Sequence, residues 1–543
     1  MSDALVQWLR RPETYPEPTA TVTLVETHIS WVFLTDSFAY KLKKPVTFDF
    51  LDFSTAELRR AACEDEVRLN RRLAAHVYRG VVAVRRNERH DLFLDESSVG
   101  ECGSSRDAAP VVDWLVKMRR LPADRALDAL HRAGQLSDHD LSRLAERFVK
   151  FYCDAERPIV LPEEYRGTIA RHVRANRSSL LAAAADDEHP LAVSATAIKR
   201  IHASQLQFLL LAPGLFDSRI AARRIVDGHG DLRPEHIYLL PAPVAIDCLE
   251  FSAEFRRLDI ADELSFLATE CDFIGAQAVG QQIANRCLQL LGDVPPPELL
   301  DFYKAYRACV RAKVAVLRAR QADCRDRQAA LAQAAEHLTL AQHYADEFSY
   351  GLPLFRLIVV HGLTGSGKST LAAALADELG AEWLSTDAIR QQMFGASTEP
   401  AVYGEGHYRP ADRMAVYEAL FAATEQHLTD GVSVVLDGTF LTADLRRQPV
   451  DLAGRHGARP LFVHCTCPDD VARQRIAQRN SAGRGASESR PDILDRQKAD
   501  EQPTTTVGIA ESQSGASVKA VEIDTTHSMS DQIAVVVEHL HNG

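Results

Sequence analysis

The sequence predicts two domains of different fold class: an α+β domain with two lobes, followed by an α/β domain with a doubly wound parallel sheet. The chain has 543 residues, enough for two to four domains at roughly 150 residues each. Its first part reads as a short antiparallel sheet with one helix and then mostly helices, whereas strands and helices alternate after residue 350. The predicted domains are 1–350, with a small lobe at about 15–115 and a helical lobe at about 116–350, and 351–543.

The composition excludes several classes of protein. Hydrophobic residues make up 46% of the chain and charged residues 25%, which is typical of folded globular proteins. The net charge of -13 disfavours binding to long nucleic acids or to anionic membranes. The sequence shows no apolar run of the roughly 20 residues that span a bilayer, and its first residues lack the apolar core of a secretion signal. We therefore expect a cytoplasmic protein with neither long nucleic acid nor a membrane among its partners.

The elements follow from the spacing of apolar residues. Between residues 21 and 43, β-branched and aromatic residues alternate with polar ones, which predicts antiparallel strands. A helix is predicted over 55–75, with Ser54 or Thr55 as its N-cap. Apolar residues at helical spacing predict further helices over 137–211, 259–291 and 298–348. In the second domain, the apolar runs RLIVVHG, VSVVLDG and PLFVHCT predict parallel strands that are buried on both faces.

The most specific motif follows the first of these parallel strands. The segment HGLTGSGKST matches the GxxxxGK[ST] pattern of a phosphate-binding P-loop between a strand and a helix. Glycines let the backbone N–H groups wrap a phosphate chain, Lys368 adds a positive charge, and Ser369 offers a hydroxyl to Mg²⁺. ATP and Mg²⁺ are the expected cofactors. The predicted nucleotide-binding residues here are Gly362, Leu363, Thr364, Gly365, Ser366, Gly367, Lys368, Ser369 and Thr370.

Candidate acceptor and lid residues follow the P-loop. Asp387 and Arg390 lie one helical turn apart, so a carboxylate could take the proton of an acceptor hydroxyl while a guanidinium holds an acceptor anion. Asp437 ends an apolar strand and is predicted to help hold Mg²⁺. Arg475 and Arg479 share one face of a later helix, where a kinase lid would neutralise the phosphoryl group during transfer.

This half of the chain resembles the group of P-loop kinases that includes gluconate kinases, polynucleotide kinases and zeta-type toxins. The resemblance covers roughly residues 355–543 and rests on the P-loop and on the acceptor and lid residues just named. It implies those same roles for them, and it implies that Asp524 and Thr525 lie close to the edge that binds the nucleotide base.

A second phosphate chemistry is predicted in the first domain. HGDLRPEH, a short strand and then IDCLEF parallel the catalytic and metal-binding loops of protein-kinase-like folds. In that pattern Asp231 aligns the acceptor hydroxyl, Arg233 stabilises the γ-phosphate and Asp247 holds Mg²⁺. His229 is predicted to brace the loop, and His236 stands at the position of a second metal ligand.

The same pattern requires a lysine on a strand and a glutamate on a helix. Lys41 is the predicted lysine, with Lys43 as the alternative because both lie on one face of the strand. Glu66 is the predicted helical partner, and Glu64 is the alternative. The order of these residues along the chain gives the prediction its weight, because Lys–Glu pairs are common on solvated surfaces.

The first domain resembles the aminoglycoside phosphotransferase and choline-kinase-like branch of the kinase fold over about residues 20–345, with HGDL as the shared signature. It departs from that branch in two places. His236 stands where the branch usually has an asparagine ligand, and the VETHISW loop lacks the glycines that cover ATP phosphates. The whole chain resembles a bacterial group labelled bifunctional aminoglycoside phosphotransferase/ATP-binding protein.

The expected function is that of an ATP-dependent phosphotransferase with two nucleotide sites. Each site would pass a γ-phosphate to a hydroxyl acceptor, which could be a small molecule, a nucleotide or a protein. The first alternative is a P-loop kinase or ATPase regulated by a nucleotide-binding pseudokinase domain. The second alternative makes the second domain a nucleotide-switched ATPase or binding module without an acceptor.

Overall fold

The computed structural model describes residues 2–27, 29–48, 51–96, 109–321, 326–349, 357–395, 409–458, 460–481, 491–502 and 518–541. The chain divides into two compact units. The first consists of Met1–Pro162, Leu215–Arg311 and Leu317–Arg327, and the second of Glu163–Gly214, Ala312–Val316 and Gln328–Gly543. The boundary predicted at residue 350 lies outside the described residues, and helical segments that precede it in the sequence belong to the second unit.

The first unit contains an antiparallel sheet of six strands, three of which lie within residues 21–43, where the alternating pattern predicted antiparallel strands. The strand order is β1-β2-β3-β8-β6-β7. The strands are β1 (Thr23–Glu26), β2 (Ser30–Leu34), β3 (Phe38–Lys43), β6 (Tyr78–Arg86), β7 (Leu92–Asp95) and β8 (Val111–Arg119). A two-stranded ladder of β4 (Thr47–Phe48) and β5 (Leu51–Asp52) follows β3.

One long helix covers a face of this sheet. Helix α2 (Ala56–Ala74) begins after Thr55, whose side chain accepts a hydrogen bond from the N–H of Leu58, so Thr55 is the N-cap. The helix packs on β6 and β8 and buries Glu66 together with its apolar residues. The short helix α1 (Ser2–Leu9) packs its apolar side chains with those of the opposite face. The sheet is therefore buried on both sides.

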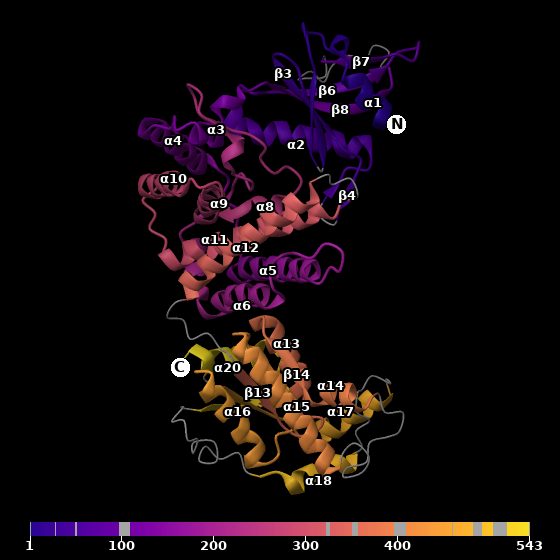
Figure 1. Cartoon of the computed structure of the whole chain (residues 1–543), viewed down its shortest axis with the longest axis vertical. Helices are drawn as coiled ribbons and strands as arrows, with labels where there is room; N and C mark the ends of the chain where they lie inside the picture. The colour runs from indigo at the N-terminus through magenta and orange to yellow at the C-terminus, as the bar shows by residue number, and fades with distance from the viewer. Residues whose placement is uncertain are drawn as a thin grey trace. The chain divides into compact units, whose positions relative to one another are not determined.

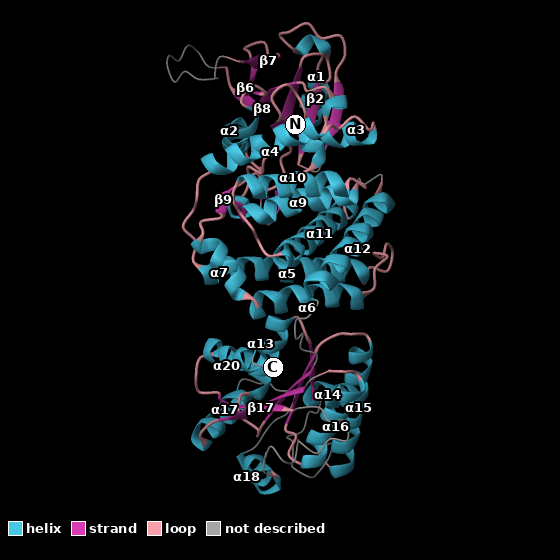
Figure 2. Cartoon of the chain, turned by 90° about the vertical axis from the view of Figure 1, so that its left-hand side faces the viewer, coloured by secondary structure: helices cyan, strands magenta, loops and turns pink. Residues whose placement is uncertain are grey.

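The rest of the first unit is mainly helical (Figure 2). Its helices are α3 (Leu127–Arg132), α4 (Asp138–Asp154), α7 (Pro213–Ala221), α8 (Ala253–Arg256), α9 (Ile260–Phe273), α10 (Gln277–Leu290) and most of α11 (Pro297–Ala319). Two small ladders lie among them and flank the loops that contain Asp231 and Asp247. They pair β9 (Ile225–Asp227) with β12 (Arg257–Asp259), and β10 (Ile237–Tyr238) with β11 (Val244–Ala245).

The second unit contains a parallel sheet of five strands in the order β14-β15-β13-β16-β17. Helices cover both of its faces, which confirms the predicted doubly wound α/β fold. The strands are β13 (Leu357–His361), β14 (Glu382–Ser385), β15 (Val434–Gly438), β16 (Pro460–Thr466) and β17 (Lys519–Asp524). The helices are α13 (Lys368–Leu379), α14 (Thr386–Phe394), α15 (Pro410–Thr429), α16 (Ala443–Arg455), α17 (Asp469–Ser481), α18 (Pro491–Asp500) and α20 (Met529–His541). Among the described residues, no helix combines the length and the apolar character needed to cross a membrane.

Three helices that precede residue 350 complete this second unit. Helix α5 (Pro162–Ala184), helix α6 (Ala195–Leu211) and helix α12 (Arg327–Ser349) belong to it. Helix α6 packs on α13 and α20 (Figure 1), and its last leucines join the apolar cluster beneath the sheet. Arg177 Nη2 and Lys199 Nζ lie 3.1 and 3.2 Å from Glu382 Oε1, at the start of β14. The α5–α6 pair is thus part of the framework of the second unit.

The backbone of α13 approaches that of α6 closely at Gly380, the C-cap of α13. Gly380 has φ of 65°, and a Cβ there would lie 2.9 Å from the Cα of Ala203 on α6. We expect Gly380→Ala to destabilise the second unit by about 2–4 kcal/mol, because it adds a steric clash to the cost of a left-handed alanine. Thermal unfolding of the full chain measures this.

Gly457→Ala is the matched control for this prediction. Gly457 has φ of 61° in the same unit, and nothing lies within 4 Å of the Cβ it would gain. Its replacement should therefore cost only the left-handed backbone term, about 1–2 kcal/mol. Equal losses from both variants would show that α6 does not pack tightly against Gly380.

Candidate functional sites

The P-loop connects β13 to α13 in the conformation that its glycines predicted. Gly362, Gly365 and Gly367 have φ of 142°, 84° and 86°. A Cβ on Gly362 would lie 2.4 Å from the carbonyl oxygen of Cys465, and one on Gly365 would lie 2.6 Å from that of Ala472. Neither position has room for a side chain, so glycine is required by both sterics and backbone conformation.

Thr525, which follows β17, supports the P-loop through a hydrogen bond. Its Oγ1 donates to the carbonyl oxygen of Ser366 at 2.6 Å. Arg475, on α17, donates from Nη1 to Thr525 Oγ1 and from Nη2 to the Thr525 carbonyl oxygen, both at 2.8 Å. Arg475 thus contacts the support of the P-loop, and Arg479 lies half-buried one turn further along α17. The lid role of both arginines stays a prediction.

A carboxylate suited to a cation lies at the end of β15, beside the first turn of α13. Asp437 is 4% exposed, and its Oδ1 has no hydrogen-bond partner among the described residues. Burial raises the pKa of Asp437, and the Lys368 ammonium opposes that rise. Lys368 Nζ lies over the loop, 3.4 Å from the carbonyl oxygen of Leu363. An unpaired buried carboxylate oxygen near the hydroxyl of Ser369 fits a Mg²⁺ ion.

The predicted acceptor residues are brought together on α14. Ser385 caps this helix by accepting from the N–H of Ala388. Asp387 Oδ1 and Arg390 Nη1 form an ion pair at 2.5 Å. Asp387 is also close enough to Asp437 for its charge to raise the pKa of that group. The acid that could accept a hydroxyl proton therefore lies near the proposed metal ligand.

Tyr417, on α15, is a neighbour of this site that the sequence analysis missed. Its hydroxyl accepts from the N–H of Phe440 at 3.0 Å and lies 3.3 Å from Thr439 Oγ1. It therefore fixes the chain just beyond Asp437. A lone tyrosine in a helix carries no sequence signal for such a role.

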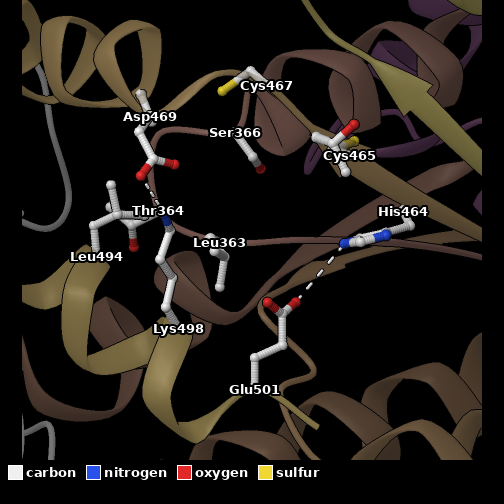
Figure 3. Close-up of a pocket in the computed structure, with 12 residues that line it drawn as sticks. Leu363, Thr364, Ser366, His464, Cys465, Cys467, Asp469, Leu494, Lys498 and Glu501 are labelled. Carbon is white, nitrogen blue, oxygen red and sulfur yellow. Dashed lines mark hydrogen bonds and ion pairs between the residues drawn. The ribbon is translucent and has the colours of Figure 1, made fainter. Parts of the chain in front are cut away.

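A pocket opens beside the P-loop, between the loop, the end of β16 and α18 (Figure 3). Gln497, on α18, accepts the N–H of Thr364 at 2.9 Å and so connects that helix to the loop. His464 Nε2 lies 3.8 Å from Glu501 Oε1, and Lys498 pairs with Asp469 at the opposite wall. The predicted acceptor pair of α14 does not line this pocket.

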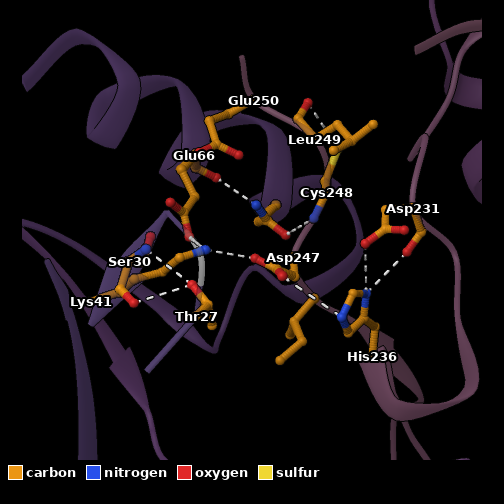
Figure 4. A network of polar contacts seen from close by, with 12 residues as sticks. Thr27, Ser30, Lys41, Glu66, Asp231, His236, Asp247, Cys248, Leu249 and Glu250 are labelled. Carbon is orange, nitrogen blue, oxygen red and sulfur yellow. Dashed lines mark hydrogen bonds and ion pairs between the residues drawn. The ribbon is translucent and has the colours of Figure 1, made fainter. Parts of the chain in front are cut away.

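In the first unit, residues from four separate segments meet around Lys41 on β3 (Figure 4). Lys41 Nζ lies 2.9 Å from Glu66 Oε1, on α2, and 2.6 Å from Asp247 Oδ1, just after β11. Burial opposes the charge on Lys41, but the two carboxylates raise its pKa well above the usual value. Burial also opposes the charge on Asp247, and Lys41 holds the pKa of that group well below its usual value. These shifts favour the charged forms of Lys41 and Asp247.

The contacts of the alternative lysine and glutamate favour Lys41 and Glu66, and this assignment stays a prediction. Lys43 Nζ lies 2.7 Å from the second oxygen of Glu66, Oε2, so both lysines bind the same carboxylate. Lys43 also pairs with Glu250. Glu64 points away and pairs with Arg60 at 2.9 Å on the exposed side of the helix. Glu66 is the buried partner, and only Lys41 also reaches Asp247.

The loop between β9 and β10 places Asp231 beside these groups. Arg233 Nε lies 3.1 Å from Asp231 Oδ2. Burial lowers the pKa of His229 to about 3, so this histidine is neutral. Its Nδ1 accepts the N–H of Asp231 at 3.4 Å, and its Nε2 lies 3.1 Å from the carbonyl oxygen of Ile246. His229 thus connects the loop of Asp231 with the loop of Asp247, and the bracing role predicted for it stays a prediction.

Asp231, His236 and Asp247 each offer a ligand atom within 4.8 Å of one another. His236 Nδ1 lies 3.0 Å from the carbonyl oxygen of Asp231, so a proton on Nδ1 would leave Nε2 as the ligating atom. Nε2 lies 3.7 Å from Asp247 Oδ2 and 2.8 Å from Arg233 Nη2. Two carboxylates and an imidazole nitrogen form a donor set that fits a divalent cation.

The comparisons with known proteins match both parts of the chain. Residues 357–504 match a family model described as an AAA domain. Over 480 residues the chain is 34% identical to "Uncharacterized protein Rv2004c" of Mycobacterium tuberculosis, covering 88% of this chain and 90% of that protein. "Uncharacterized protein Mb2027c" of Mycobacterium bovis matches with the same values, 34% over 480 residues.

Solved structures resemble each part separately. A choline/ethanolamine kinase family protein from Mesorhizobium loti covers 63% of this chain and 99% of its own, at 12% identity and a TM-score of 0.34. A gluconokinase from Sinorhizobium meliloti covers 35% of this chain and 93% of its own, at 19% identity and a TM-score of 0.25.

Proposed function

The chain belongs to the family of the mycobacterial protein Rv2004c, and we propose that it is an ATP-dependent phosphotransferase with two nucleotide sites. Each site would transfer a γ-phosphate to a hydroxyl acceptor. The observation that carries the proposal is the convergence of Lys41, Glu66, Asp231 and Asp247, which lie far apart in the sequence, in a chain that also has a complete P-loop. Chance surface pairs do not bring together a lysine, its helical glutamate and two further acids in this order.

In the second unit, the backbone N–H groups of the P-loop would bind the phosphates of ATP, and Lys368 would neutralise the β- and γ-phosphates. Ser369 and Asp437 would hold Mg²⁺, which supplies charge neutralisation at the transferred phosphoryl group. Asp387 would accept the proton of the acceptor hydroxyl, and Arg390 would hold an anionic group of the acceptor. Arg475 and Arg479 are proposed to close over the phosphates as lid residues.

In the first unit, Asp231 would orient the acceptor hydroxyl and Arg233 would stabilise the γ-phosphate. Asp247 and His236 would hold the metal ion, with Lys41 on the phosphates. Because Lys41 contacts Asp247 at 2.6 Å, nucleotide binding has to exchange this contact for one with phosphate. The acceptors would be small molecules, nucleotides or protein hydroxyls, and the use of ATP points to the cytoplasm.

One observation favours a second candidate function, in which the first unit is a nucleotide-binding pseudokinase that regulates a P-loop kinase or ATPase. The metal position holds the imidazole of His236, which is a poorer ligand for Mg²⁺ than a side-chain amide or carboxylate oxygen. Such a site could bind nucleotide and still transfer phosphate slowly.

Turnover of Mg²⁺-ATP by the full chain separates the two functions, because kinases release phosphate to water when no acceptor is present. Asp231→Asn and Lys368→Ala should each remove part of the hydrolysis, and the double variant should remove all of it. Loss through Lys368→Ala alone would favour the regulated P-loop enzyme. Hydrolysis that survives in the double variant would contradict both functions.

A further inference from the structure

Lys43 is a second buried lysine directly behind Lys41. It is 0% exposed and follows Lys41 by two residues on β3. Lys43 binds Glu66 Oε2, whereas Lys41 binds the other oxygen of this carboxylate, Oε1. Lys43 also pairs with Glu250. Burial opposes its charge, but Glu250 and Glu66 raise the pKa of Lys43 above its usual value. Lys43 therefore connects strand β3, helix α2 and the loop that carries Asp247 through charged contacts inside the protein.

The loop that Lys43 reaches has an unusual backbone conformation. Asp247 has φ of 65°, in the left-handed region that few residues other than glycine adopt. The Tyr78 hydroxyl accepts the N–H of Asp247 at 3.1 Å, and Asn70 Oδ1 accepts the N–H of Cys248 at 2.9 Å. The Lys43–Glu250 pair is a third contact, three residues after Asp247.

Nucleotide binding would require Lys41, but not Lys43, to exchange an ion-pair partner. Lys41 contacts the half-exposed Asp247 carboxylate, so Lys41 has to change partner when phosphate and metal enter. Both partners of Lys43, Glu66 and Glu250, are buried carboxylates, at 0% and 4% side-chain exposure. Lys43 would therefore keep both ion pairs when nucleotide binds. Glu66 would then stay in place through Lys43 while Lys41 moves.

We propose that Lys43 and Glu250 are positioning residues for the nucleotide site of the first unit. They hold Glu66 and the 247–250 loop so that Lys41 and Asp247 face the phosphates and the metal. This inference rests on the proposed function of that site and adds a role for two residues which themselves contact neither nucleotide nor metal.

The test replaces the pair by apolar residues of similar length, with Lys43→Met and Glu250→Met in one chain. All variants carry Lys368→Ala, so that titration calorimetry with Mg²⁺-ATP reports the first site alone. We expect the double variant to bind Mg²⁺-ATP about 10- to 100-fold more weakly, as is typical when the partners that orient a ligand-binding group are removed. In the absence of nucleotide, the backbone amides of residues 247–250 should exchange hydrogen faster in the double variant than in its Lys368→Ala parent.

A second buried pair in the same lobe provides the control. Arg59 and Asp113 form a bidentate pair at 2.9 and 2.8 Å between α2 and β8, without touching Glu66 or Asp247. The double variant Arg59→Met/Asp113→Leu should lower the melting temperature about as much as Lys43→Met/Glu250→Met does. It should leave the affinity for Mg²⁺-ATP and the amide hydrogen exchange of residues 247–250 unchanged.

The outcomes separate the inference from the proposed function. Equal effects of the two double variants, or no effect of the Lys43/Glu250 variant, would overturn the positioning role. If the Lys368→Ala parent binds no Mg²⁺-ATP, the proposed function of the first site fails. In that case hydrogen exchange still decides whether Lys43 and Glu250 hold the loop.

Discussion

Replacing Glu66 with alanine is expected to lower the free energy of unfolding of the first unit by about 3–5 kcal/mol, because it leaves buried lysines without their shared counter-charge. Lys41 and Lys43 each bind one oxygen of this carboxylate, and the glutamate side chain is 0% exposed. Differential scanning calorimetry of the full chain should show one transition that moves to lower temperature.

Glu64→Ala is the control for this prediction. Glu64 lies on the same helix, but its ion pair with Arg60 is more than half exposed on both sides, at 53% and 55%. Exposed pairs of this kind contribute about 0–1 kcal/mol, so the melting profile should hardly change. If Glu66→Ala were as mild as Glu64→Ala, the two lysines would not depend on Glu66 for their burial.

Lys368→Ala is expected to weaken Mg²⁺-ATP binding at the second site by about 2–4 kcal/mol, which is roughly 30- to 1000-fold. The ammonium lies over a loop that would otherwise bind phosphate through neutral N–H groups, so its loss removes a full positive charge from the site. Titration calorimetry should show the stoichiometry falling from two bound nucleotides to one.

The matched control is Lys498→Ala. Lys498 lines the pocket beside the P-loop and pairs with Asp469 at the surface, outside the phosphate-binding loop. Its removal should change the affinity by less than about 1 kcal/mol. Two intact sites in Lys368→Ala would mean that the lysine does not contact phosphate.

The P-loop could be predicted from the sequence because its residues lie in one continuous segment between a strand and a helix. Strand–loop–helix order and glycine spacing therefore determine its geometry locally. The site around Lys41 is formed by four segments that lie far apart in the sequence. Only the order of these segments along the chain indicated that they belong to one site. The structure brings all four together.

The other contacts of the two sites, and the packing of α6, could not be predicted because they depend on distant segments of the chain. Period-2 alternation places Lys41 and Lys43 on one face, so only the structure shows that both bind Glu66. The contact of Thr525 with the Ser366 carbonyl joins residues far apart in the chain. An amphipathic pattern likewise reveals that α6 has an apolar face, but not that the face packs on α13 and α20.

The placement of α5 and α6 in the second unit has a consequence for the order in which the chain acquires its structure during synthesis. The ribosome completes α6 about 150 residues before it reaches β13, and translation proceeds at about 5–20 residues per second. The apolar end of α6, at Leu210 and Leu211, is therefore made roughly 7–30 seconds before β13, the first strand of the sheet in the sequence. During that interval α6 lacks the strands and helices that cover its apolar end in the folded unit, so we expect this end to be accessible to chaperones that bind apolar segments.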